Sequence, residues 1–170
     1  MIQSIEPFGF LDSNLNLTQP KSFYIWGAIK EITFTLSGYE ISDITEQQKQ
    51  AYNEFIANPI EYIKIIETSL FDYYVLNRDE IYKDLLDDKM APCIKNPSDL
   101  RIIFDWNQIY FLPNKGIVFM FEVSFEPEMG IGVLMANKEV QCIDVQAHFI
   151  WINISCFTLV HHVYTVEQNS

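Results

Sequence analysis

The chain has 170 residues, of which 49% are hydrophobic and 15% aromatic, with only six glycines and seven prolines. That composition excludes a disordered or collagen-like chain, and the length fits a single domain over residues 1–170. The 11 basic residues against 23 acidic ones give a net charge of −12, which disfavours nucleic acid and anionic membranes as partners.

The first 40 residues are expected to form strands. A short strand is predicted near residues 8–11, and the turn residues at 12–14 follow it. Residues 22–36 are rich in β-branched and aromatic side chains, and their second half alternates apolar and polar positions, as a strand with one buried face does. Gly27 is predicted to mark a bulge within this long strand.

From Thr45 the apolar residues recur at helical spacing, which predicts a helix over about 45–57 with Thr45 as its N-cap. The pair Asn58-Pro59 is expected to end this helix and to open a second one that runs to about residue 76. A third helical run is predicted from about residue 81 to residue 90, before Ala91-Pro92.

The second half returns to the period of strands. Two short strands, a hairpin turn at 113–116 and three further strands are predicted, with the strands at 100–104, 108–112, 117–125, 131–135 and 139–145. We therefore predict an α+β domain, in which a mostly antiparallel sheet, a meander, carries two or three helices packed on one face.

Residues 149–166 alternate in the same way and predict a strand of unusual length. Because an exposed apolar strand is normally covered by a helix or by a second copy, a homodimer is one expectation for this protein. Whether the segment forms one strand, a hairpin or an interface stays open at this point.

The charge is concentrated in the predicted helices. Residues 40–88 hold 12 acidic and 4 basic residues, which accounts for −8 of the net charge of −12. A solvated surface is the simplest interpretation, and the alternative is an acidic docking surface for a basic protein. Tyrosines among the acids favour protein binding, so the candidate partner-binding residues are Asp72, Tyr73, Asp79, Tyr82, Asp84, Asp87 and Asp88.

Motifs for chemistry are missing from the sequence. It has no Walker loop, GxGxxG, GxSxG, HExxH or calcium loop, and we predict no cofactor and no enzyme activity. Cys142 and His148 belong to a loose set of metal-ligand types with Cys156, His161 and His162, but the set lacks the close ligand pairs of zinc sites. A hydrolase with a carboxylate and histidine site is kept as a third hypothesis for the function.

One segment resembles a known pattern. Residues 123–133 read VSFEPEMGIGV, which is similar to a motif of uncharacterised bacterial domains, roughly W-D-x-E-H-G-x-G-V between two strands. Met129 replaces the usual His, and the resemblance extends to a helix end at 70–74 and a helix start at 45–48. The motif positions in the predicted turn are Glu126, Glu128, Gly130 and Gly132.

Such domains resemble the immunity proteins that accompany bacterial polymorphic toxins. The resemblance implies a small cytoplasmic binding protein that neutralises a cognate toxin, which is our leading hypothesis, and a structural or homodimerising domain is the alternative. A cytoplasmic location also fits the sequence, because its start lacks the features of a signal peptide and its three widely spaced cysteines suit reduced thiols.

Overall fold

The fold was analysed in a computed structural model, which describes residues 2–83, 90–146 and 148–149. The strands and helices follow in the order β1 (Gln3–Ile5), β2 (Gly9–Leu11), β3 (Lys21–Ile25), β4 (Ala28–Leu36), η1 (Ile41–Asp43), α1 (Glu46–Ala57), α2 (Pro59–Lys83), η3 (Pro97–Ile102), β5 (Phe104–Phe111), β6 (Ile117–Val123), β7 (Ile131–Ala136) and β8 (Glu139–Val145).

Six strands form the main sheet in the order β3-β4-β5-β6-β7-β8, and β1 and β2 form a separate hairpin. All neighbouring strands of the main sheet are antiparallel except β4 and β5, which are parallel. Parallel neighbours need a long crossover connection, and here α1, α2 and η3 supply it. The chain is an α+β protein with a mostly antiparallel sheet, as predicted, and the parallel pair is a feature that the sequence patterns had not indicated.

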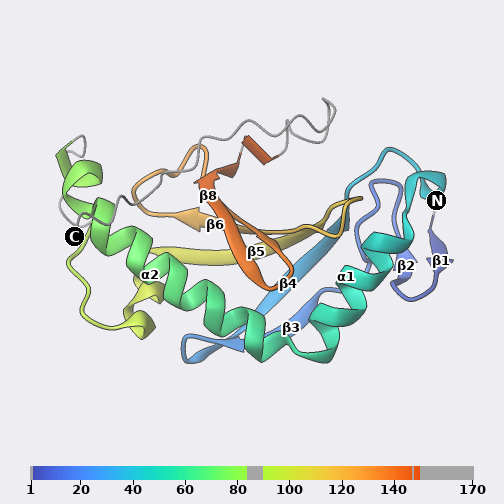
Figure 1. The fold of residues 1–170 in the computed structure, drawn as a ribbon, viewed down its shortest axis with the longest axis horizontal. Helices are drawn as coiled ribbons and strands as arrows, with labels where there is room; N and C mark the ends of the chain where they lie inside the picture. The colour runs from blue at the N-terminus through green and yellow to red at the C-terminus, as the bar shows by residue number, and fades with distance from the viewer. Residues whose placement is uncertain (1, 84–89, 147, 150–170) are drawn as a thin grey trace.

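Both long helices lie on one face of the sheet (Figure 1). The α1 side chain Phe55 contacts the rings of Phe34, Phe111 and Phe119, and Tyr62 of α2 also contacts Phe119. Buried aromatic rings thus fill the space between helices and sheet. Edge-to-face pairs of this kind add to the burial of apolar area, so this layer is the main core.

The helix boundaries follow from local chemistry. Thr45 caps α1 through a capping box with Gln48, as predicted for Thr45. Asn58 ends α1 and Pro59 opens α2, also as predicted. The predicted break near residue 76 is wrong, because α2 continues to Lys83 as one helix of 25 residues. Tyr74 before the predicted break and Ile81 after it both pack against the main core, which favours one continuous helix over two.

Two strand predictions are corrected as well. Residues 22–36 form a hairpin and not one bulged strand, since Trp26 and Gly27 both have positive φ and make the two-residue turn between β3 and β4. The separate strands predicted at 100–104 and 108–112 are η3 followed by the continuous strand β5. A register shift between Trp106 and Gln108 lets β5 continue past the point where its pattern breaks.

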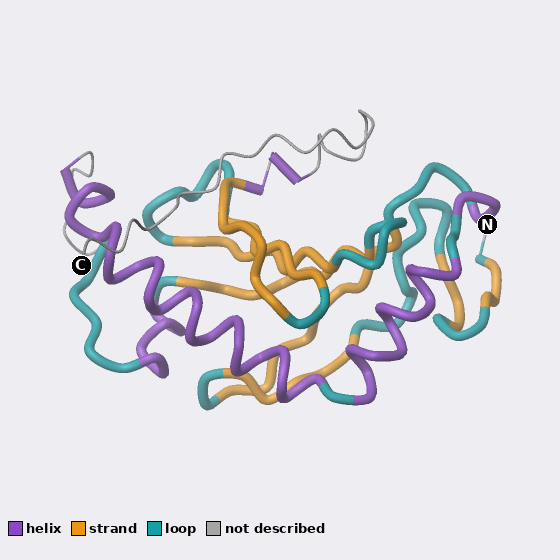
Figure 2. Tube along the Cα trace, in the orientation of Figure 1, coloured by secondary structure: helices purple, strands orange, loops and turns teal. Residues whose placement is uncertain are grey.

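The opposite side of the sheet, which we call the second face, does not carry α1 or α2 (Figure 2). A small apolar cluster of Leu112, Val118, Met120 and Phe149 lies on it near β6 and β7. Elsewhere it carries the polar pair Gln108 and Thr35, in which Gln108 Nε2 donates to Thr35 Oγ1 at 2.8 Å, and the exposed side chains of Tyr24 and Ile29. Phe149 is helical in the structure, and the remainder of the strand predicted at 149–166 lies outside the described residues. None of the described helices has the continuous apolar stretch that a transmembrane span requires.

Candidate functional site

The predicted partner-binding residues lie on or beyond the C-terminal half of α2. Asp72 and Asp79 are exposed on this helix and Tyr73 is half-buried. Tyr82 lies within the helix, but its side chain is outside the description, and the same holds for Asp84, Asp87 and Asp88 as whole residues. The described part of this acidic surface is therefore the outward side of α2 up to Lys83.

That outward side also carries apolar residues, which sequence reasoning missed. Leu76 is 76% exposed and Val75 is 49% exposed. With Asp72 and Asp79 they occupy positions i, i+3, i+4 and i+7, so the four residues form one strip along the helix, which we call the α2 strip. The helical spacing was a usable signal, but it identifies the strip only once α2 is known to continue past residue 76.

Acids near the junction of α1 and α2 are neutralised by lysines in two turns of the sheet. Lys115 Nζ lies 2.6 Å from Glu54 Oε1, and Lys138 Nζ lies 2.6 Å from Glu61 Oε2. The hydrogen bond to Glu61 raises the pKa of Lys138, which keeps that ammonium charged. The α2 strip lies away from these two lysines, and within it Asp79 Oδ1 lies 3.4 Å from Arg78 Nη1 at the helix surface.

The helix end that resembles the bacterial motif has a structural role. Tyr74 is fully buried, packs against Phe104 and Phe125, and donates from its hydroxyl to the carbonyl of Pro92 at 2.7 Å. Burial raises the pKa of this phenol. One turn later, Arg78 Nε donates to the carbonyl of Ala91 at 3.1 Å. These bonds attach the segment after α2 to the helix.

The helix start that resembles the motif is structural too. Gln48 is completely buried, and its Nε2 donates to the carbonyls of Ser37 and Phe111, each at 2.8 Å. Its Oε1 accepts from the backbone N–H of Thr45 at 2.9 Å. Gln48 therefore joins α1 to the ends of the parallel strands β4 and β5, where the antiparallel pattern of the sheet is interrupted.

The motif turn separates into exposed acids and buried glycines. Glu128 is exposed and Glu126 is half-buried, and neither carboxylate makes a hydrogen bond or ion pair with the described residues. Gly130 has φ +58, and a Cβ there would lie 2.4 Å from Gln146 Nε2, whose bond to the carbonyl of Phe121 it would obstruct. Gly132 was predicted in the turn but lies in strand β7, paired with Met120, and a Cβ there would lie 2.4 Å from the ring of Phe149. Because glycine has no Cβ, both positions leave space for side chains of the segment that follows β8.

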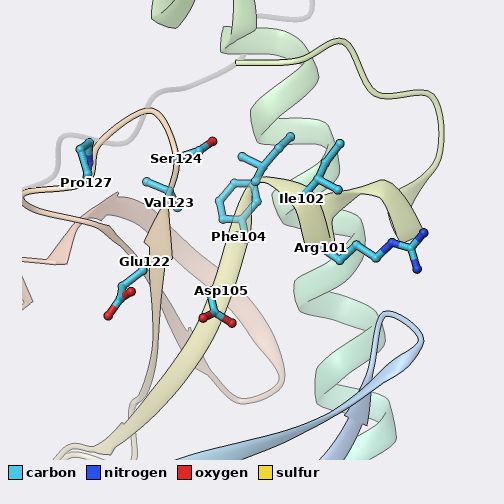
Figure 3. Close-up of a pocket in the computed structure, with 9 residues that line it drawn as sticks. Arg101, Ile102, Phe104, Asp105, Glu122, Val123, Ser124 and Pro127 are labelled. Carbon is cyan, nitrogen blue, oxygen red and sulfur yellow. The ribbon is translucent and has the colours of Figure 1, made fainter. Parts of the chain in front are cut away.

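One hollow opens on the second face beside the end of η3, with a volume of about 250 Å³. Asp105 and Glu122 project into it from paired strands, whereas Arg101 extends away from both carboxylates (Figure 3). Asp105 is paired with Lys30 and Glu122 accepts from Asn107 Nδ2 at 2.9 Å. The described lining includes neither cysteine nor histidine, and the hollow is smaller than the usual range for small-molecule sites.

The cysteine and histidine candidates are not brought together by the described part of the chain. His148 Nδ1 lies 3.3 Å from Asp144 Oδ2 at the end of β8. Burial, followed by the charge of Asp144, raises the pKa of the Cys142 thiol, which opposes formation of a thiolate nucleophile at neutral pH. Cys156, His161 and His162 lie outside the described residues, and the described ones contain no group of three or more metal-ligand side chains.

Fold and surface together define an α+β domain whose motif-like positions hold helices, strands and loops in place. A family model described as Domain of unknown function (DUF6985) matches residues 7–150. The match covers most of the chain, and the protein belongs to this family of uncharacterised domains. No curated protein and no solved structure matches it.

Proposed function

We propose that this chain is a non-enzymatic binding domain for a basic protein, and that the α2 strip is its contact surface. The observation that carries the proposal is the exposure of Leu76 and Val75 between Asp72 and Asp79 on a helix anchored to the core. Exposed apolar residues supply contact area, and flanking carboxylates select a positively charged partner and accelerate its approach.

The most specific form of the proposal is an immunity protein that acts in the bacterial cytoplasm and neutralises a cognate toxin. Support comes from the resemblance at residues 45–48, 70–74 and 123–133, and from the net charge of −12. A toxin with a basic active site would be attracted by this charge. Gln48, Tyr74 and Gly130 are buried and stabilise the fold. Binding is assigned to the α2 strip because exposed apolar side chains lie between its acids there.

Co-expression with the product of the adjacent gene tests the proposal. We expect a stoichiometric complex and restored growth where that product is toxic. The double variant Asp72→Lys/Asp79→Lys is expected to weaken the complex at least about tenfold, or about 1.4 kcal/mol. The matched control, Glu128→Lys/Glu139→Lys, changes the net charge equally at exposed positions outside the α2 strip. No complex, or equal weakening by both double variants, would contradict the proposal.

A further inference from the structure

The first strand of the main sheet has a free edge. β3 is the outermost of the described strands, and β4 is its only neighbour among them. Trp26 and Gly27 form a two-residue turn, so Ile25 and Ala28 exchange backbone hydrogen bonds, and this pattern alternates along the hairpin. The N–H and C=O groups of Ser22 and Tyr24 therefore point away from β4, and among the described residues nothing bonds them.

The other edge of the sheet is interrupted. A register shift between Leu134 and Met135 breaks the regular pairing of β7 with β8, and such irregularities hinder the addition of another strand. β3 has no register shift and no proline within its five residues. The free edge of β3 is therefore the better template for pairing with a further strand.

Side chains beside this edge are apolar and exposed. Tyr24 and Ile29 lie directly opposite each other on the second face, and each is 73% exposed. On the helix side, Phe23 stacks on Phe34 and meets Phe55, yet it stays half-buried. An added strand would complete the burial of Phe23 and cover Tyr24 from the side.

Charge indicates which residues that strand carries. Glu31 is exposed opposite Ser22 and shares the second face with Tyr24. Arginines of an added strand on this face would stack on Tyr24 and reach Glu31. Lys21 begins β3 on the same side as Phe23, where a basic residue would be repelled and an apolar one would pack. A strand that alternates basic and apolar residues matches both sides.

We propose that the edge of β3 binds an extended segment of a partner protein by strand addition, and that this segment alternates basic with apolar residues. Backbone bonds to Ser22 and Tyr24 hold the segment, and Tyr24, Phe23 and Glu31 select its side chains. This site is distinct from the α2 strip, so the proposal can be tested independently of the binding function assigned to that helix.

The test uses a blocked six-residue peptide of alternating Arg and Val. At saturating peptide, amide hydrogen exchange at Ser22 and Tyr24 is expected to slow about tenfold or more, while Phe23 and Ile25, already bonded to β4, change little. A peptide with Glu in place of Arg, and one N-methylated at alternate residues, are expected to bind at least about tenfold more weakly.

Two variants locate the site. Tyr24→Pro removes an outward N–H that β4 does not use, as edge strands tolerate, and Tyr24→Lys keeps the backbone but repels the peptide. Both are expected to weaken binding about tenfold, whereas Tyr39→Lys, at an exposed loop tyrosine, leaves it unchanged. Circular dichroism checks that each variant folds.

Unchanged exchange at Ser22 and Tyr24, equal binding of the N-methylated peptide, or protection at β8 instead would overturn the proposal. So would light scattering that shows a dimer which Tyr24→Pro dissociates, because the edge would then bind a second copy of this chain.

Discussion

The two faces of the sheet use the same strands in opposite ways. The helix-covered face is a continuous aromatic core in which Phe34, Phe55 and Phe119 are fully buried. The second face carries a hydrogen-bonded polar pair, Thr35 and Gln108, and a small apolar cluster around Phe149. It also carries the exposed side chains of Tyr24 and Ile29. The comparison shows that the large aromatic core lies on one side, whereas the described part of the other side leaves Tyr24 and Ile29 exposed beside its edge.

The largest expected effect tests this difference directly. Phe119→Ala removes a ring that contacts Phe55, Tyr62 and Trp106, and we expect a loss of about 4 kcal/mol in the free energy of unfolding. Thr33→Ala, half-buried on the second face, is expected to cost less than about 0.5 kcal/mol. Urea denaturation measures both. Similar costs would refute the asymmetry between the faces.

The next effect concerns the joint between helices and sheet. Gln48→Leu leaves the buried carbonyl of Ser37 without the Nε2 donor and removes the second half of the capping box. We expect a loss of about 3 kcal/mol in thermal or chemical unfolding. The neighbouring Gln47→Leu, at an exposed position of the same helix turn, is the matched control and should change stability little. A Gln48→Leu protein as stable as the control would show that Gln48 is dispensable.

A smaller effect is expected where the second face has its own cluster. Gly132→Ala places a methyl group against the Phe149 ring, and displacing that ring should cost about 2 kcal/mol of stability. In a Phe149→Ala background the same substitution should be nearly neutral, because the obstruction is gone. A double-mutant cycle measures the coupling. Equal losses of stability in both backgrounds would mean that contact with Phe149 is not the reason why position 132 requires glycine.

The smallest effect is a pH dependence. Burial raises the pKa of Tyr52, Tyr62 and Tyr74 under the helices, and of Tyr110 on the second face. The unfolded chain therefore loses these protons first as the pH rises above about 10, and stability falls there by at most about 1.4 kcal/mol per tyrosine and pH unit. Absorbance at 295 nm should show a late phase that coincides with the loss of circular dichroism. Complete ionisation before unfolding would contradict this.

Local chemistry made much of the fold predictable. The Thr45 cap, the Asn58-Pro59 junction and the strand over Glu139–Val145 each depend on a few neighbouring residues. Predictions were wrong where a pattern was compatible with two structures. Gly27 fits a bulge or a turn, and the apolar residues around 76–81 fit one helix or two, because the choice depends on what packs against them.

The candidate site was only half visible in the sequence. Asp72 and Asp79 were predicted because charged residues can be identified from the sequence alone. Val75 and Leu76, in contrast, have the residue types expected in the core of an amphipathic helix. The motif glycines indicated a turn, but Gln146, the partner of Gly130, and Phe149, the partner of Gly132, lie 16 and 17 residues further along the chain. Contacts at that separation leave no periodic signal.

The sequence alone determined the α+β class and most element boundaries, because hydrophobic periods, caps and turns involve residues that are close in the chain. It also determined the acidity of the helices, which is a matter of composition. The parallel pairing of β4 with β5, the burial of Gln48 and the free edge at Tyr24 depended on packing. These features depend on which strands become neighbours in the sheet. That choice is decided by the free energy gained from burial across the whole core, set against the entropy lost when the long crossover between β4 and β5 is ordered.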